Sequence, residues 1–200
     1  MEKYNKKFAR LLIIYFGLMA LIFLFLLLLP GYVLTIAAIL FLAVPYIFGK
    51  GLGLRISQKS LVFSLMVSVL LIGIYMLSFI LVSGRNINYS SLSFALVFNH
   101  LVAISLPEEA FFRGYLQEEL GNDLKSIFVV SVLFALGHLI TICAFSGHFG
   151  LHCVSALLTF LPSLVMGFLY YKTKSIWGSV IFHFLANLAY ISTSGYSVFY

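Results

Sequence analysis

The chain has 200 residues, of which 62% are hydrophobic and only 9% are charged, and its mean hydropathy is +1.11. This composition excludes a soluble globular domain and indicates a polytopic membrane protein. Twelve basic residues outnumber six acidic ones. They lie at the ends of apolar runs, as membrane topology signals do, so we expect the lipid bilayer as a partner and no nucleic acid.

Apolar runs of membrane-spanning length recur along the whole chain. The first follows a polar segment at 1–10, and a basic connector at 50–59 follows the second. Turn-rich sequences at 83–90 and 121–123 bound the fourth run. The pattern predicts an all-α, polytopic membrane helical bundle with about seven transmembrane helices, at 11–29, 32–48, 61–82, 92–106 with a continuation to 120, 126–145, 154–171 and 175–192.

The whole chain, 1–200, is predicted to form a single membrane domain. The spans within 11–90 match no pattern that we can assign, whereas the spans within 91–192 carry the chemistry described below. If the N-terminus is cytoplasmic, seven crossings place ten of the twelve basic residues inside, leave Arg85 outside and put Arg113 near the inner interface. We therefore predict a multi-pass protein of the cell membrane with a cytoplasmic N-terminus, cytoplasmic segments at 1–10, 50–59 and 172–174, and external loops at 83–90 and 146–152.

Five of the six acidic residues lie between Glu108 and Asp123, and the first two are adjacent at the end of a hydrophobic run. A carboxylate at membrane depth is costly, so it usually faces a protein interior or a water-filled cavity and serves a function. The adjacent pair, Glu108 and Glu109, is the natural starting point for a search for a site.

Three spans bring ionisable side chains to a similar depth. At 1.5 Å per residue, Glu108 lies roughly 13 Å from the expected inner interface, His138 roughly 18 Å and His183 roughly 12 Å. Asn187 follows His183 by four residues and shares its helix face. Each residue alone is typical of ordinary helix packing, but their common depth favours a joint functional role.

The two glutamates are predicted to differ. Glu109 and Arg113 have the i, i+4 spacing that favours an ion pair on one helix face. Glu108 points about 100° away and has no basic partner at helical spacing, which makes it the freer carboxylate and the better candidate base or ligand. The sequence from Ser105 to Glu108 also fits a capping box with Pro107 in the first turn, which predicts a kink or a helix restart there.

At these residues a family resemblance becomes specific. The sequence from Glu108 to Leu116, EEAFFRGYL, resembles the first motif of the CPBP family of intramembrane proteases, the CAAX-processing and bacteriocin-immunity or Abi family. Phe134-x-x-x-His138 resembles its second motif, and the sequence from Ser175 to Asn187 resembles its later ones. The resemblance covers about half of the chain.

The resemblance implies an all-helical bundle whose active site opens toward the cytoplasm. It implies a catalytic cluster of Glu108, His138, His183 and Asn187, with Glu109 and Arg113 as a supporting pair. The implied activity is an endopeptidase of the CAAX prenyl protease type acting on a membrane-associated peptide or protein, such as a bacteriocin or pheromone precursor. A non-hydrolytic bacteriocin self-immunity protein or membrane scaffold is the alternative, and a proton-coupled transporter is a further one.

Two chemistries remain open for this cluster. In one, Glu108 and His138 activate water while His183 and Asn187 stabilise the oxyanion, with no cofactor. In the other, Glu108, His138 and His183 ligate a catalytic zinc ion, as in a metalloprotease. Further candidate ligands are His100, His148 and His152, of which the last two lie in the expected outer loop.

Two cysteines, Cys143 and Cys153, flank that outer loop. They could form a disulfide if the loop faces an oxidising compartment. Two separate, small packing residues are the favoured interpretation.

Overall fold

The computed structural model describes residues 2–49, 53–90, 92–146 and 150–194. Within these ranges all regular structure is helical, as predicted. The elements are α1 (Glu2–Leu28), η1 (Pro30–Tyr32), α2 (Val33–Phe48), α3 (Gln58–Ser83), α4 (Phe94–Asn99), η2 (His100–Ser105), α5 (Leu106–Glu109), η3 (Ala110–Gln117), α6 (Glu118–Leu120), α7 (Leu124–Ser146), α8 (Leu151–Ser155), η4 (Ala156–Thr159), α9 (Phe160–Thr173) and α10 (Ile176–Ser194).

In the described part of the chain, seven helices are long and apolar enough to cross a membrane, which confirms the predicted number. The ranges are Asn5–Leu28, Pro30–Phe48, Gln58–Ser83, Phe94–Leu120, Leu124–Ala144, Cys153–Thr173 and Ile176–Thr193. They agree with the predicted spans because length and apolar composition alone decide whether a helix can cross the hydrocarbon layer.

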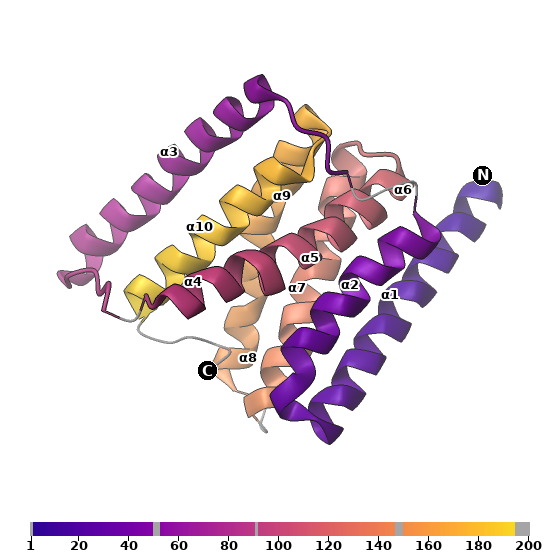
Figure 1. Cartoon of the computed structure of the whole chain (residues 1–200), viewed down its shortest axis with the longest axis horizontal. Helices are drawn as coiled ribbons and strands as arrows, with labels where there is room; N and C mark the ends of the chain where they lie inside the picture. Colours follow the sequence, from indigo (N-terminus) through magenta and orange to yellow (C-terminus); the bar gives the residue numbers. More distant parts are fainter. Residues whose placement is uncertain (1, 50–52, 91, 147–149, 195–200) are drawn as a thin grey trace.

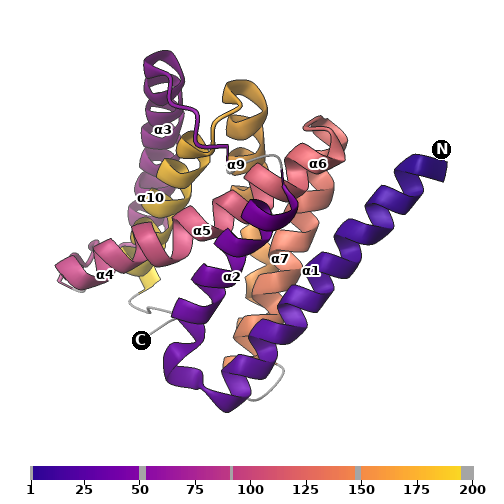
Figure 2. The same cartoon turned by 45° about the vertical axis from the view of Figure 1, so that its right-hand side comes forward.

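The fourth span, from α4 to α6, runs through the middle of the bundle (Figures 1 and 2). It packs against α2 on one side and against α10 on the other. Helices α7 and α9 complete the core, while α1 and α3 lie on opposite flanks (Figure 1). Helix α1 contacts α2 and α7, whereas α3 packs mainly on α10.

The central span continues as a helix through Pro107, so the predicted capping box and restart are wrong. Ser105 has helical dihedrals (φ −62°, ψ −46°) and makes no side-chain capping bond. Two π-helical segments, η2 and η3, flank α5 instead, and the Leu106 amide donates to the Leu101 carbonyl five residues earlier. The wider π turns accommodate a proline that has no N–H and a bulky ring, which a membrane helix tolerates when neighbouring elements satisfy the backbone.

The turn after α6 has the predicted chemistry. Gly121 (φ +114°) and Asn122 (φ +48°) both adopt positive φ, a conformation that glycine and asparagine tolerate best. Asp123 then caps α7, because the Ser126 amide donates to its carboxylate at 2.7 Å while its own amide donates to Ser126 Oγ at 2.8 Å. This reciprocal cap fixes the direction in which α7 leaves the central span.

Aromatic side chains join the N-terminal helices to the central span and α7. Phe41 of α2 contacts Phe111 and Phe112 of η3, with ring centroids 5.2 and 5.9 Å apart. Tyr15 of α1 donates a 2.6 Å hydrogen bond from its hydroxyl to the Leu133 carbonyl of α7, and its ring is fully buried. Helices α1 and α2 are therefore integral parts of the core.

Cys143 and Cys153 form a disulfide between α7 and α8, with their Cα atoms 5.0 Å apart. The favoured interpretation of two separate packing residues is therefore wrong. The cysteines are ten positions apart in the sequence. The helices that carry them turn back on each other closely enough to meet the Cα spacing of a disulfide.

Candidate active site

The acidic pair lies on α5, the short α-helical segment between the two π-helical segments. Glu109 is fully buried, and its Oε2 accepts a 3.1 Å charge-assisted hydrogen bond from Nε of the equally buried Arg113. This confirms the predicted i, i+4 pair. The Glu108 side chain is 14% exposed. Glu108 and Glu109 therefore occupy different environments, as their angular separation on the helix predicts.

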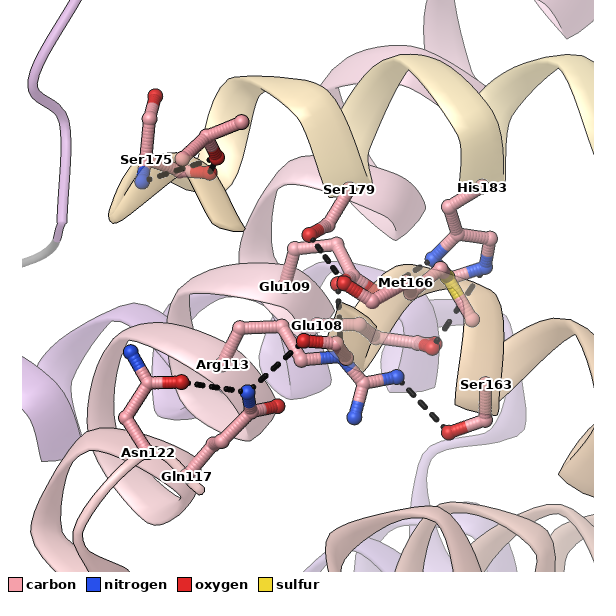
Figure 3. Close-up of polar contacts among 12 residues, drawn as sticks. Glu108, Glu109, Arg113, Gln117, Asn122, Ser163, Met166, Ser175, Ser179 and His183 are labelled. Carbon is pink, nitrogen blue, oxygen red and sulfur yellow. Dashed lines mark hydrogen bonds and ion pairs between the residues drawn. The ribbon is translucent and has the colours of Figure 1, made fainter. Parts of the chain in front are cut away.

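Glu109 also holds a histidine, which the sequence did not indicate. Its Oε1 lies 3.0 Å from Nδ1 of His183 on α10 (Figure 3). An ionised carboxylate can only accept, so Nδ1 of His183 carries a proton and its ring orientation is fixed. Glu109 therefore bridges Arg113 and His183 and holds both side chains in place.

Glu108 faces the other nitrogen of the same histidine. Its Oε2 lies 3.9 Å from His183 Nε2. This oxygen is buried and makes no hydrogen bond. The adjacent carboxylates of α5 thus approach opposite nitrogens of one imidazole ring, and only Glu109 forms a hydrogen bond with it.

His138 of α7 reaches this region from the side of the N-terminal helices. Its Nδ1 lies 3.0 Å from the Phe134 carbonyl, one turn earlier on the same helix. A carbonyl only accepts, so Nδ1 donates there and Nε2 keeps its lone pair when the ring is neutral. His138 and Glu108 line the same cavity.

Asn187 lies one helical turn beyond His183 but contacts a residue of a different element. Its Nδ2 is 3.5 Å from Nδ1 of His100, the first residue of η2. His100 is 4% exposed, and its Nε2 is buried without a hydrogen-bond partner. The sequence suggested His100 only as a further metal ligand. In the structure it contacts Asn187, the predicted oxyanion donor.

Side-chain hydrogen bonds join the central span to α9. Arg113 donates from Nη2 to Ser163 Oγ at 2.8 Å (Figure 3). Gln117 donates from Nε2 to the Gly167 carbonyl at 2.9 Å. Glu109, Arg113 and Gln117 follow one another at four-residue spacing, as Ser163 and Gly167 do. The matched spacing places two hydrogen bonds between the central span and α9. It was the signal in the sequence from which this contact could have been predicted.

The predicted site residues therefore fall into three groups. Glu108, Glu109 and His183 meet directly. His138 joins them through the cavity that it shares with Glu108, and Asn187 shares the helix face of His183 and contacts His100. Of the other candidate ligands, His148 and the side chain of His152 lie outside the described residues.

A catalytic zinc ion would need Glu108, His138 and His183 to converge on one point. Among the residues that the structure describes, no group of three His, Cys, Asp or Glu side chains is close enough to hold a metal ion. Glu108 and His183 come near each other, but His138 does not complete a ligand set with them. The residues as placed do not fit a bound zinc ion.

Comparison with known proteins agrees with the motifs in the central span, α7 and α10. Residues 89–189 match the model of the family described as type II CAAX prenyl endopeptidase Rce1-like. No curated protein and no solved structure matches the chain. The matched segment spans half of the chain, from the loop before α4 to the second half of α10, and it includes every predicted site residue. The chain belongs to the Rce1-like family of type II CAAX prenyl endopeptidases.

Proposed function

We propose that this protein is an intramembrane endopeptidase that hydrolyses a peptide bond of a membrane-associated peptide or protein. The observation that carries the proposal is the arrangement around Glu108. This carboxylate lines a cavity together with His138 and faces Nε2 of His183 at 3.9 Å. A largely buried carboxylate that faces one histidine and shares a cavity with another suits acid–base chemistry in a membrane bundle.

In the proposed reaction, Glu108 and His138 bind one water molecule in the cavity and remove its proton. The water oxygen forms a bond to the carbonyl carbon of the peptide. The proton taken from the water then passes to the nitrogen of the leaving amine as the C–N bond breaks. Microscopic reversibility lets the same carboxylate or imidazole that accepts the proton return it.

His183 and Asn187 would stabilise the negative charge that develops on the carbonyl oxygen. For this role His183 must donate from Nε2, and because Nδ1 is held by Glu109 it must do so as an imidazolium. In that form the buried cluster of Glu108, Glu109, Arg113 and His183 carries no net charge.

A library of membrane-anchored peptides tests the proposal. Each peptide would carry one apolar span joined to a randomised segment, and mass spectrometry would identify the cleaved bonds. The wild-type protein in liposomes should cleave the library, and Glu108→Gln should abolish cleavage while leaving the protein folded. Glu119→Gln is the matched control, because Glu119 pairs with Lys7 at 2.8 Å, away from the histidines.

Equal cleavage by the Glu108→Gln and wild-type proteins would overturn the catalytic role of Glu108. A wild-type protein that retains peptides without cleaving them would instead support the non-hydrolytic alternative, a membrane scaffold or self-immunity protein.

A further inference from the structure

An apolar groove lies at the surface of the bundle, where α7 packs against η4 and α9. It has a volume of about 240 Å³ and is lined by Val132, Ala135, Leu136, Leu157 and Phe160. An apolar cavity of about 150 Å³ holds one benzene ring, so this groove has room for several carbon atoms of a chain. We call it the α7–α9 groove, and it shares no lining residue with the cavity beside Glu108 and His138.

A stripe of side chains on α9 connects the groove to the basic end of the bundle. The stripe has four-residue spacing and therefore follows one face of the helix through Phe160, Leu164, Phe168 and Lys172. Phe160 lines the groove, and Phe168 is 39% exposed. From Phe160 to Lys172 the helix rises by roughly 18 Å, which is close to the roughly 15 Å of hydrocarbon in one leaflet of a bilayer. An acyl chain that starts at Lys172 therefore reaches the groove.

Two lysines hold their positive charges against one aromatic ring at the basic end. Lys172 Nζ lies 5.6 Å from the centroid of the Phe168 ring and 5.4 Å from that of Tyr171. Lys174 Nζ lies 5.9 Å from the same Tyr171 centroid. Both lysines are exposed, and in the part of the chain that the structure describes neither has a carboxylate partner. Because ring faces attract cations, the two charges stay close together and attract an anion from outside the protein.

We propose that this face of α7 and α9 is a binding site for one anionic phospholipid. Its phosphate group lies between Lys172 and Lys174, and one acyl chain follows the stripe on α9 and ends in the α7–α9 groove. A zwitterionic headgroup carries its own ammonium group, which the two lysines repel, so the site selects a lipid of net negative charge. Lysines that only set the topology need no groove beside them. The site does not depend on the proposed function, because it shares no residue with the candidate active site.

The chain has one tryptophan, which makes a fluorescence test possible. Trp177→Phe removes it, and Leu161→Trp then places a single tryptophan next to the groove at a position that is 60% exposed. Leu70→Trp, on α3 and 62% exposed, is the control reporter. Each protein would be reconstituted in phosphatidylcholine with a small fraction of phosphatidylglycerol, and the chains of one lipid at a time would carry bromine. Bromine quenches tryptophan fluorescence on contact, so the quenching identifies the lipid beside each reporter.

The reporter at position 161 should prefer phosphatidylglycerol to phosphatidylcholine by about fivefold or more, the gain expected from one basic residue near an anionic headgroup. The reporter at position 70 should show little preference. Lys172→Gln combined with Lys174→Gln should lower the preference at position 161 to that at position 70. Arg55→Gln combined with Lys59→Gln is the matched control, because it removes two exposed charges from the connector before α3 and the start of α3, and it should keep the preference.

Retention of the lipid in detergent tests the groove. Native mass spectrometry of the wild-type protein should find one phosphatidylglycerol molecule per chain. Val132→Phe should lose it, because the new ring fills the groove, whereas Val69→Phe, the same change at a position of α3 that is 60% exposed, should keep it. Glycerol phosphate, the headgroup without acyl chains, should not displace the retained lipid, which distinguishes a phospholipid from a free phosphate ester.

Four results would overturn the proposal. Equal lipid preference at positions 161 and 70 would show ordinary boundary lipid. An unchanged preference in the double lysine variant would remove the headgroup site, and equal retention by Val132→Phe and Val69→Phe would remove the chain site. A tryptophan at position 161 that neither brominated lipid quenches would show that a second copy of the chain covers this face instead.

Discussion

Glu109 has two oxygens and two partners, and this sets it apart from Glu108. Arg113 occupies one oxygen at 3.1 Å and His183 the other at 3.0 Å, all in a buried environment. The ion pair followed from spacing along one helix. The contact with His183 did not, because the sequence does not fix how far α10 is rotated about its own axis relative to α5.

The first prediction separates the two glutamates by stability. Glu109→Gln should destabilise the protein by about 3–5 kcal/mol, because it leaves the charge of Arg113 buried without compensation. It should also impair cleavage, since His183 loses its charged partner. Glu108→Gln should abolish cleavage with almost unchanged stability, because the carboxylate of Glu108 makes no hydrogen bond through Oε2.

Thermal unfolding in detergent, together with turnover, measures both effects. Glu119→Gln serves as the control for a carboxylate in a partly exposed ion pair, for which a change of about 0–1 kcal/mol is expected. Equal stability of the Glu108 and Glu109 variants would contradict the assignment of the buried pair.

The second prediction concerns His100, which we expect to act as a positioning residue for Asn187. His100→Leu removes the acceptor at 3.5 Å from Asn187 Nδ2, so the amide loses its fixed orientation. The kcat should fall by about tenfold with KM unchanged, because a misplaced donor stabilises the transition state less well. In Asn187→Ala protein the same substitution should have no additional effect, and additive losses would show that His100 acts independently of Asn187.

The third prediction concerns metal. Because Glu108, His138 and His183 do not converge, cleavage should persist after treatment with a chelator. Elemental analysis of the active, purified protein should find less than one zinc ion per chain. Loss of cleavage on chelation, with recovery on addition of zinc but not of magnesium, would contradict this and restore the zinc-ligand set.

At the scale of the elements, the sequence predicted where helices lie but not how they are wound. The local order of Ser105, Pro107 and Glu108 satisfies the pattern of a helix start. In the structure, α4 and η2 lead continuously into α5, because the packing of η2 and α5 against α2 and α10 outweighs the local signal. The sequence pattern also does not predict η2 and η3, because π turns depend on the register of neighbouring helices. Such wide turns occur frequently at functional sites.

The fourth prediction tests how α3 is held. A Cβ atom on Gly178 of α10 would clash with Oγ and Cβ of Ser64, which is fully buried on α3. Gly178→Ala should therefore cost about 1–3 kcal/mol in stability and loosen α3, which packs mainly on α10. Limited proteolysis at 53–57 and thermal unfolding would report the effect.

Gly73→Ala is the matched control for this substitution. Gly73 lies inside α3 and has no atom within 4 Å of an added Cβ, so alanine there should be neutral or stabilising, as expected for an exposed helix position. If Gly178→Ala is as stable as Gly73→Ala, then the close approach of α3 and α10 does not depend on this glycine.

At the scale of the whole molecule, hydropathy predicted seven spans but not which spans pack against each other. In a membrane, lipid-facing and core-facing residues are both apolar, so the pattern along a span does not show which face packs. Only 6% of the apolar window of α3 is buried, compared with 50% for α10, although the apolar windows of both qualify as membrane spans. The same ambiguity hid the positions of α1 and α2, which line the cavity beside Glu108 and His138.

The basic segments gather at one end of the bundle. Lys7 of α1 pairs with Glu119 of α6 at 2.8 Å. The connector after α2 is joined to the turn between α9 and α10, because the Ile176 amide donates to the Gly53 carbonyl at 3.0 Å and the Trp177 ring donates to the Leu54 carbonyl at 3.3 Å. The turn between α1 and α2 and the start of α4 lie at the opposite end (Figure 1). This segregation supports the predicted topology.

The fifth prediction is that the basic end is cytoplasmic. Single cysteines at Arg55 and Asn86, both exposed, would be introduced into a background with Cys143→Ser and Cys153→Ser. In intact cells a membrane-impermeant thiol reagent should label position 86 and not position 55, and permeabilisation should expose position 55. The Arg55→Cys change preserves the backbone carbonyl that accepts a hydrogen bond from Ser175, so the connector should keep its place. Labelling of position 55 from outside would reverse the orientation, and with it the side from which a substrate reaches Glu108.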